Sequence, residues 1–324
     1  MTVLIAILLV VVGIALLGFG ADVLVRGAVT IAKVARIPAA VIGLTIVSMG
    51  TSLPELTVSV SAALRGASDL GVGNVVGSNI FNIGVVLGLT AMLAPMRVHS
   101  SAVRLEWPFM FIASFQLLLL ARDGMLDRLE GLFFVVGLGL FTAYVVRIGR
   151  SELGAEEHAD LRETVERRDA PKEMQSVGKA LALVAAGVAL LVIGGDVLLR
   201  GAIELARLAG MTERVIGLTI IAAGTGAPEA ATSLMAARRG QGEIALGNVI
   251  GSNIFNILGI LGVTALVAPL SVSDAMVQSD FVWMLGLSFI LFPFMRSGAR
   301  IARMEGGVLV AAYGTYLTLL VLNG

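Results

Sequence analysis

The chain consists of two copies of one sequence, and this repeat limits its possible folds more than any other feature. Shifting the sequence by 174 residues aligns two pairs of segments without a gap, namely 41–66 on 215–240 and 69–95 on 243–269. In the first pair 15 of 26 positions are identical, and in the second 16 of 27. Because the offset also matches residues of the first apolar run, we expect each repeat to be a complete half of the chain.

Both halves are strongly apolar. Of the 324 residues, 57% are hydrophobic and 14% are charged, whereas a soluble domain carries roughly 25% charged residues. The chain has 39 glycines, which suits helices that pack closely in lipid. A net charge of zero argues against a nucleic-acid partner. The composition therefore indicates a membrane protein whose main partner is the lipid bilayer.

Ten apolar runs are long enough to cross a bilayer, which takes about 20 residues. They lie at approximately 3–25, 38–64, 70–94, 103–121, 128–148, 178–200, 212–237, 243–268, 278–295 and 305–322. The first run has no basic residue before it and no evident cleavage site, so we expect a span and not a signal peptide. The sequence thus predicts an all-α membrane protein with ten transmembrane helices.

The two halves are predicted to be inverted repeats. Each contains five spans, an odd number, so the second half must enter the membrane in the opposite direction from the first. The expected parts are 1–150 as the first repeat (helices 1–5), 151–177 as a cytoplasmic linker, and 178–324 as the second repeat (helices 6–10). Inverted repeats are typical of secondary transporters, whose substrates bind near the midplane at helices interrupted by Gly or Pro.

Two glutamates occupy matching places in the middle of apolar runs. Residues 50–55 read GTSLPE and residues 224–229 read GTGAPE. A charged side chain at the centre of a bilayer costs on the order of 3 kcal/mol. Its occurrence twice, as Glu55 and Glu229, therefore indicates a functional role.

A proline precedes each glutamate and is expected to interrupt its helix. Each proline removes a helical N–H, so the carbonyl group four residues earlier loses its partner. The polar side chains beside these carbonyls are Thr51, Ser52 and Glu55 in one half, and Thr225 and Glu229 in the other. Ca²⁺ takes about 6 to 8 oxygen ligands, whereas Zn²⁺ prefers Cys or His. This set of oxygens predicts a site for a hard cation.

The motifs GNVVGSNIFN and GNVIGSNIFN supply further oxygens. Their G-x-x-x-G spacing lets another backbone approach closely. Ser78 and Asn82 are four residues apart and share a helix face, as do Ser252 and Asn256. These hydroxyl and amide oxygens could complete the ligand shell.

No nucleotide-binding pattern occurs in the sequence. We therefore expect neither an enzyme nor a cofactor-dependent protein, and transport would be driven by an ion gradient.

The paired motifs, GTSLPE with GNVVGSNIFN and GTGAPE with GNVIGSNIFN, resemble the two alpha repeats of the sodium/calcium exchangers in the cation/Ca²⁺ antiporter superfamily. The resemblance covers nearly the whole chain and is strongest to the short prokaryotic members. It implies an antiporter that exchanges Ca²⁺ for Na⁺ by alternating access, with four cation sites between helices 2, 3, 7 and 8. Helices 1 and 6 would slide as a gate.

The resemblance also implies roles for individual residues. Ca²⁺ would be held by Glu55 and Glu229 with the backbone of Thr51 and Thr225. Na⁺ would be held with help from Ser52, Ser78, Ser252 and the carbonyl groups of Ser48 and Ala222. Asn82 and Asn256 would line the middle site.

Two positions depart from the family pattern and leave the coupling ion open. Gly226 stands where serine is common, so one Na⁺ site loses a hydroxyl unless the glycine is needed for packing. Asn256 stands where some relatives have aspartate, which resembles potassium-independent members. The alternatives are a proton/Ca²⁺ antiporter and, from a different class, a passive cation channel. A carrier should saturate and show counter-flow, and a channel should not.

Basic residues predict the orientation of the chain. With the N-terminus outside, 17 of the 23 Lys and Arg residues fall on cytoplasmic connections, as the positive-inside rule requires. We therefore expect both termini outside, in the inner membrane of a prokaryotic cell, and a protein that functions as a monomer.

The absence of cysteine makes this orientation testable. A Ser151→Cys variant should resist an impermeant thiol reagent added to whole cells and should react after the cells are permeabilised. Ready labelling of intact cells would contradict the orientation.

Overall fold

The computed structural model describes residues 2–35, 37–151, 177–210 and 222–323. Short 3₁₀- and π-helical segments are labelled η. The first half contains α1 (Val3–Ala35), α2 (Ala39–Ile42), η1 (Gly43–Val47), α3 (Ser48–Thr51), α4 (Leu53–Leu64), α5 (Ser68–Phe81), η2 (Asn82–Leu87), α6 (Gly88–Leu93), β1 (Met96–Arg97), η3 (Ala102–Glu106), α7 (Trp107–Leu120), η4 (Ala121–Asp123), β2 (Met125–Leu126) and α8 (Arg128–Ser151).

The second half contains α10 (Val177–Leu208), α12 (Ala222–Thr225), α13 (Ala227–Arg238), α14 (Gly242–Ile254), η6 (Phe255–Leu261), α15 (Gly262–Val267), β3 (Leu270–Ser271), η7 (Met276–Asp280), α16 (Phe281–Arg296), η8 (Ser297–Ala299), β4 (Arg300–Ile301) and α17 (Arg303–Asn323). The predicted linker lies almost wholly outside the described residues.

The all-helical membrane fold is confirmed. Each of the ten apolar runs contains helix within the described ranges, and the seventh, 212–237, is described from Ala222 onward. Seven helices are long and apolar enough to cross a membrane, or eight when the bent pair Ala39–Thr51 and Leu53–Leu64 counts as one span. The described residues also contain four strands of two residues each, which the sequence did not predict.

Each predicted helix interruption lies where the proline motif occurs. The second span bends by 46° where α3 meets α4. Ser52, at this junction, leaves helical backbone with φ −85° and ψ 10°, and Pro54 lies in the first turn of α4, where its missing N–H costs no helical hydrogen bond. Gly226 has nearly the same backbone angles, φ −81° and ψ 5°, and Pro228 lies in the first turn of α13. Each break therefore places the following glutamate in the first turn of a new helix.

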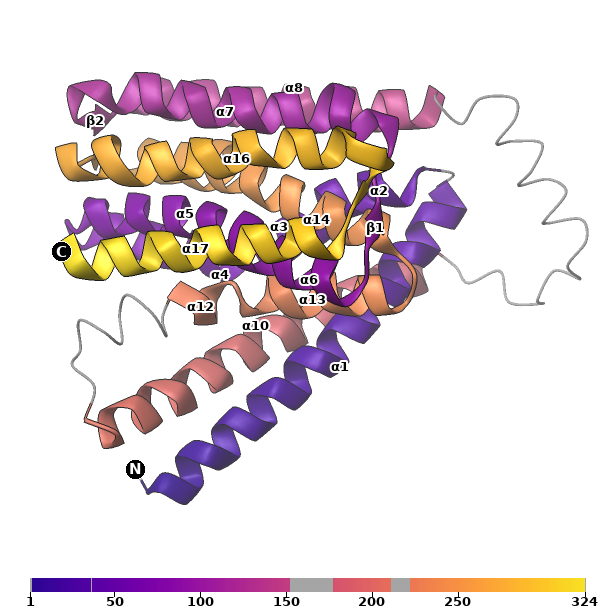
Figure 1. The fold of residues 1–324 in the computed structure, drawn as a ribbon, viewed down its shortest axis with the longest axis horizontal. Coiled ribbons are helices and arrows are strands. Elements are labelled where there is room, and N and C mark those ends of the chain that lie inside the picture. The colour runs from indigo at the N-terminus through magenta and orange to yellow at the C-terminus, as the bar shows by residue number, and fades with distance from the viewer. Residues whose placement is uncertain (1, 36, 152–176, 211–221, 324) are drawn as a thin grey trace, which may run out of the picture.

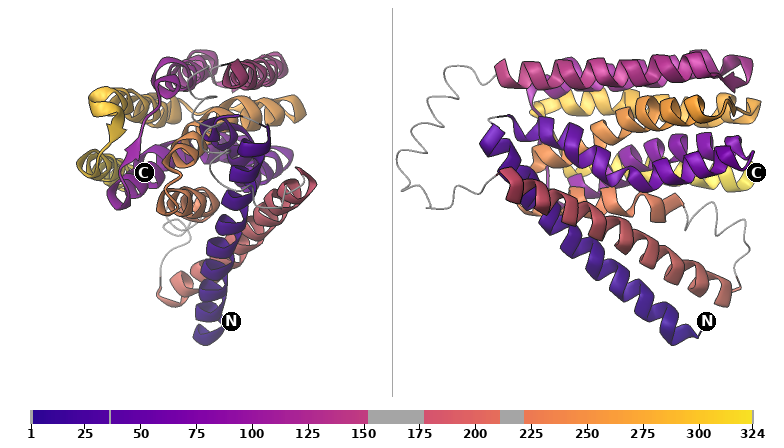
Figure 2. Two further views of the ribbon diagram at one scale, coloured as in Figure 1. Left: turned by 90° about the vertical axis from the view of Figure 1, so that its right-hand side faces the viewer. Right: turned by 180° about the vertical axis from the view of Figure 1, so that it is seen from behind.

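Two composite helices form the centre of the bundle. The spans that contain α5–η2–α6 and α14–η6–α15 are mostly buried, whereas those that contain α1, α7, α8, α10 and α16 are buried over only 22–28% of their most apolar stretch. Figure 1 shows α1 and α10 running obliquely along one side of the bundle, with α7 and α8 on the opposite side. Both termini lie at the same end of the bundle in Figures 1 and 2, as an even number of spans requires.

Short strand pairs join the two halves. Strand β1 pairs with β4 and strand β2 pairs with β3, both antiparallel. Each pair combines a strand from the first half with one from the second. Figure 1 places β1 and β2 at opposite ends of the bundle, so the halves are connected at both ends.

The second G-x-x-x-G motif brings α14 against α2 and η1. A Cβ atom on Gly247 would lie 2.5 Å from the Ala40 carbonyl oxygen, and one on Gly251 would lie 2.4 Å from the Leu44 carbonyl oxygen. Both distances are below any real Cβ contact, so only glycine fits at either position. The predicted close backbone approach is confirmed here, and the equivalent partner of the first motif, 214–218, lies outside the described residues.

The long helices α1 and α10 cross through two equivalent glycine contacts. A Cβ on Gly13 would lie 2.6 Å from the backbone of Leu198, and a Cβ on Gly187 would lie 2.6 Å from the backbone nitrogen of Leu24. The 174-residue offset relates these two contacts. Close helix packing in lipid depends on such small residues.

We therefore expect Gly187→Ala to separate α1 from α10 and to destabilise the protein by about 1 to 3 kcal/mol. Thermal unfolding in detergent would measure the loss. Gly18→Ala is the matched control, because a Cβ on Gly18 meets no described atom within 4 Å. Equal melting temperatures for the two variants would contradict this account of the crossing.

Candidate cation-binding site

The predicted site residues are brought together where the two helix breaks face the central helices. Both glutamates are 1% exposed although they carry ionisable groups. The other predicted side chains that are buried are Ser48, Thr51, Ser52, Ser78, Asn82, Thr225, Ser252 and Asn256. Ala222 begins α12. All of the predicted site residues whose exposure is described are therefore buried.

Contacts between the halves connect the two breaks. The Ser52 hydroxyl donates to Oε1 of Glu229 over 3.0 Å. The Thr51 hydroxyl lies 3.3 Å from Oδ1 of Asn248. The carboxylates of Glu55 and Glu229 are also near enough to each other to interact electrostatically. The site is thus a joint product of both repeats.

Asn74 and Asn248 hold the helix turns that carry the glutamates. The Asn74 amide donates to the Glu55 carbonyl oxygen over 3.3 Å and to the Ser59 hydroxyl over 3.1 Å. The Asn248 amide makes the equivalent contacts with the Glu229 carbonyl, at 3.5 Å, and the Ser233 hydroxyl, at 3.0 Å. These amides fix the first turns of α4 and α13 against the central helices.

Four further amides form a reciprocal network across the centre of the molecule. The Asn79 side chain donates to the Asn253 backbone carbonyl over 3.3 Å, and the Asn253 side chain donates to the Asn79 carbonyl over 3.4 Å. Asn82 Nδ2 donates to Asn253 Oδ1 over 3.1 Å, and Asn256 Nδ2 donates to Asn79 Oδ1 over 2.9 Å. The side-chain nitrogens of Asn82 and Asn256 are thus used by the network, and their side-chain oxygens point away from it.

Buried oxygens without a partner mark the site. Among the described residues, six buried side-chain oxygens accept or donate no hydrogen bond, and five belong to predicted site residues. They are Glu55 Oε2, Glu229 Oε2, Asn82 Oδ1, Asn256 Oδ1 and Ser252 Oγ, with Thr232 Oγ1 as the sixth. An unpaired buried polar atom costs about 1 to 3 kcal/mol. A shared set of this kind is therefore expected to have a ligand.

The donor set suits a hard cation. All six atoms are oxygens, and two belong to carboxylates. Within the described ranges no group of three or more His, Cys, Asp or Glu could hold a metal ion. A cation here would therefore be balanced by two carboxylates and would complete its shell with neutral amide, hydroxyl and backbone oxygens, as Ca²⁺ accepts.

Sequence reasoning missed five of the residues in this region. Asn74, Asn79, Asn248 and Asn253 make hydrogen bonds beside the candidate ligands, and Thr232 lies one turn after Glu229. The four asparagines are identical between the repeats and lie in apolar runs, which was the signal available. The Ser48 carbonyl, predicted to help hold Na⁺, already accepts from the Ser52 N–H at 3.1 Å and the Thr51 hydroxyl at 3.2 Å.

Gly226 lies in close contact with a neighbouring side chain, so it does more than leave out the hydroxyl that serine would supply. A Cβ at this position would lie 2.7 Å from two carbon atoms of the Phe81 ring. Of the two explanations that the sequence allowed, packing is therefore the one that the geometry supports. Gly226→Ser alone is expected to impair binding of every cation.

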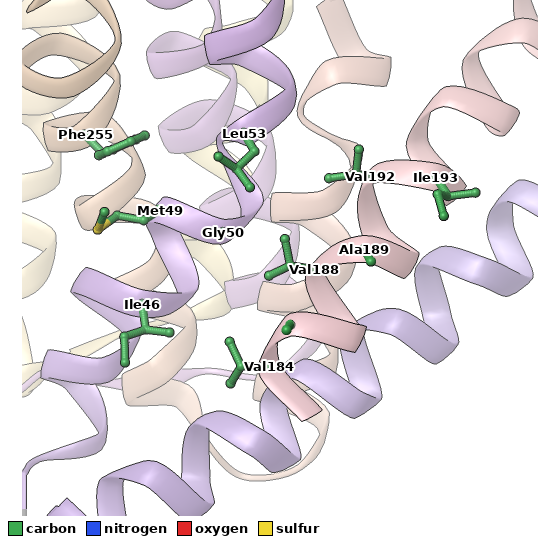
Figure 3. Close-up of a pocket in the computed structure, with 11 residues that line it drawn as sticks. Ile46, Met49, Gly50, Leu53, Val184, Val188, Ala189, Val192, Ile193 and Phe255 are labelled. Carbon is green, nitrogen blue, oxygen red and sulfur yellow. The ribbon is translucent and has the colours of Figure 1, made fainter. Parts of the chain in front are cut away.

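An apolar groove lies on the outer side of the first break. It has a volume of about 670 Å³ and runs between α10 and the α3–α4 junction. Figure 3 shows Met49, Leu53, Val188 and Val192 on its walls, with Gly50 at the junction. The lining is apolar, so the groove does not expose the ligand oxygens. At the equivalent place in the other half, α1 packs against α13.

Comparison with known proteins gives a family match over both repeats. The family model described as "Sodium/calcium exchanger protein" matches residues 5–147 and 179–322. The inner membrane protein YrbG of Escherichia coli (strain K12) is 35% identical over 326 residues, which covers 98% of this chain and 97% of YrbG. The sodium/calcium exchanger MaX1 of Methanosarcina acetivorans is 33% identical over 341 residues, with 97% of each chain covered.

A solved structure of the sodium-calcium exchanger NCX_Mj, soaked with 10 mM Na⁺ and zero Ca²⁺, has a similar fold. The TM-score is 0.83 at 29% sequence identity, and the alignment covers 98% of this chain and 99% of that chain. The two inverted repeats are thus arranged here as they are in that protein.

The amide network yields a testable prediction. Asn253→Ala leaves Asn82 Nδ2 without its partner and removes the side-chain donor to the Asn79 carbonyl, so we expect a loss of about 1 to 3 kcal/mol of stability. Cation binding should also weaken, because Asn82 Oδ1 is no longer held in place. Thermal unfolding of the purified protein with and without Ca²⁺ measures both effects.

Ser114→Ala is the matched control, since the buried Ser114 hydroxyl donates only along its own helix, to the Met110 carbonyl. Asn79→Ala should reproduce the effect of Asn253→Ala. A protein that loses no Ca²⁺ stabilisation in either asparagine variant would contradict the positioning role.

Proposed function

This chain belongs to the sodium/calcium exchanger family, and we propose that it exchanges Ca²⁺ for Na⁺ across a membrane by alternating access. As a member of the family it is an integral membrane cation/Ca²⁺ antiporter and not an enzyme. The identity of the coupling ion and the residues that bind the ions are the proposal.

One observation carries this proposal. Five oxygens of the predicted residues are buried, unpartnered within the described structure and contributed by both repeats. Two belong to the carboxylates of Glu55 and Glu229, whose charges would balance a divalent ion. Removing one carboxylate would leave that ion under-neutralised in a medium of low dielectric constant.

The proposed ligands are those that the resemblance of the two motifs implies. Ca²⁺ is held by Glu55 and Glu229 with the backbone carbonyls of Thr51 and Thr225. Na⁺ is held with help from Ser52, Ser78, Ser252 and the carbonyl groups of Ser48 and Ala222, and Asn82 and Asn256 line the middle of the site.

Unequal packing of the two halves supports alternating access. The repeats are related in sequence, yet α1 packs along α13 whereas α10 touches mainly α3 at the first break and an apolar groove lies beside α4. Inverted repeats that exchange two such arrangements would open the site alternately to the two sides. A passive channel would need no such inequality.

The names of two related proteins support sodium as the coupling ion. The names of MaX1 and NCX_Mj describe sodium/calcium exchangers, and Ser52 supplies one hydroxyl beside Glu229. Gly226 lacks the equivalent hydroxyl, and this observation keeps a proton/Ca²⁺ antiporter as the alternative.

We further propose that the protein resides in the inner membrane of a prokaryotic cell, with both termini outside, and functions as a monomer. The relative YrbG is named an inner membrane protein. The distribution of basic residues supports the orientation.

Ca²⁺ uptake into proteoliposomes tests the exchange. Vesicles are loaded in turn with Na⁺, K⁺ or choline, with and without a pH gradient, and we expect uptake only with internal Na⁺. Glu55→Gln and Glu229→Gln should fold but abolish uptake, because each removes one of the two compensating charges. Uptake should also fall as the pH is lowered, since protons compete with Ca²⁺ for the carboxylates.

The controls separate the alternatives. Uptake driven by a pH gradient without Na⁺ would identify the proton/Ca²⁺ antiporter. Non-saturating flux without counter-flow would identify a channel. Full activity in both glutamine variants would rule out the paired-carboxylate site.

A further inference from the structure

The two halves differ in how one equivalent phenylalanine packs. Phe81 and Phe255 end the identical sequence SNIF and are related by the 174-residue offset. Phe255 borders the groove of Figure 3. Phe81 instead lies against Gly226 in the other half of the chain. Equivalent residues therefore occupy different spaces.

A glycine on its own helix explains the position of Phe255. A Cβ on Gly259 would lie 2.8 Å from two ring carbons of Phe255, so the ring rests over the bare backbone of Gly259. The equivalent residue of the first half is Val85. Its Cβ occupies the space that Gly259 leaves open, so the ring of Phe81 cannot lie back along its helix in the same way.

The ring of Phe81 uses the space over a different glycine. Two of its carbons lie 2.7 Å from the place where a Cβ of Gly226 would be. Tyr313 packs against the ring edge-on, with centroids 5.8 Å apart, and Phe81 itself is buried. The residue equivalent to Gly226 is Ser52, whose side chain would exclude a ring placed in the same way.

Both of these glycines belong to the second half of the chain. The first half of the chain has Ser52 and Val85, and the second half has Gly226 and Gly259. Each phenylalanine packs over a glycine of the second half. With Val85 in place the ring of Phe81 needs the space over residue 226. Serine at position 226 is therefore incompatible with valine at position 85 as long as residue 81 is phenylalanine.

This difference between the halves makes the surroundings of the two glutamates unequal. Glu229 accepts a hydrogen bond from the Ser52 hydroxyl. The equivalent donor to Glu55 is missing because residue 226 is glycine, and the buried Oε2 of Glu55 has no partner among the described residues. Two ring carbons of Phe81 lie 2.7 Å from the position of the Cβ that would carry that hydroxyl.

We propose that Phe81 is a specificity-determining residue, whose ring replaces a Na⁺-ligating hydroxyl on the Glu55 side of the site. This inference rests on the proposed function. Na⁺ is bound by replacing its water with oxygen ligands, and a hydrocarbon wall offers none. The protein therefore binds fewer Na⁺ for each Ca²⁺ than a site with serine in both halves, and Ca²⁺ keeps both carboxylates.

The test transfers the arrangement of the second half to the first. In Gly226→Ser/Val85→Gly the ring gains the room that Phe255 has, and the hydroxyl is added. We expect a higher ratio of ²²Na⁺ to ⁴⁵Ca²⁺ flux in proteoliposomes. The Na⁺ concentration for half-maximal exchange should fall several-fold, with little change for Ca²⁺.

The single variants are the matched controls. Gly226→Ser alone should lose stability and exchange with both ions, because the serine meets the ring. Val85→Gly alone should leave the flux ratio unchanged, since it adds no ligand. A well-folded Gly226→Ser single variant with normal exchange would overturn the packing argument. An unchanged flux ratio in a folded double variant would overturn the ligand argument.

A binding measurement separates this inference from the proposed function. Protection from thermal unfolding by Na⁺ is measured for the wild type and the double variant. If the wild type shows no Na⁺-driven exchange, the Na⁺ part of the proposed function fails. Stronger Na⁺ protection of the double variant would still support the role of Phe81, and equal protection would refute it.

Discussion

The reciprocal amide contact between Asn79 and Asn253 is the interaction on which the site depends. Each side chain donates to the backbone carbonyl of the other at the centre of the bundle. Hydrocarbon offers no water to satisfy these groups, so the two repeats must satisfy each other. The contact sets the register of the central helices, and it also determines which atoms of Asn82 and Asn256 remain available.

Sequence reasoning reached the architecture and a set of buried candidate ligands because both have strong local causes. Apolar runs predict the spans, and a proline before each of Glu55 and Glu229 predicts the breaks that the structure has at Ser52 and Gly226. The asparagines that orient the ligands were missed because their partners are far along the chain. Asn79, for example, meets a residue 174 positions away, and no local pattern reports such a contact.

The environment of Gly226 is a second case in which contacts between distant residues could not be predicted from the sequence. Sequence comparison of the two halves reveals the missing hydroxyl, but not the ring that takes its place. The ring lies against Gly226 and Tyr313, which belong to different parts of the second half. The glycine at position 226, which in sequence is only the loss of a serine hydroxyl, is therefore one part of a packing arrangement that also includes Phe81 and Tyr313.

The hydrogen bonds that join the two helix breaks and the two central helices cross from one repeat to the other. Ser52 reaches Glu229, Thr51 reaches Asn248, and the asparagines pair across the centre. A separate half of this chain would carry one carboxylate and unpaired amides in lipid, so it could assemble only with a second half inserted upside down. Fusion into a single gene product removes that requirement, because the chain itself delivers one copy in each orientation, and each copy is then free to diverge.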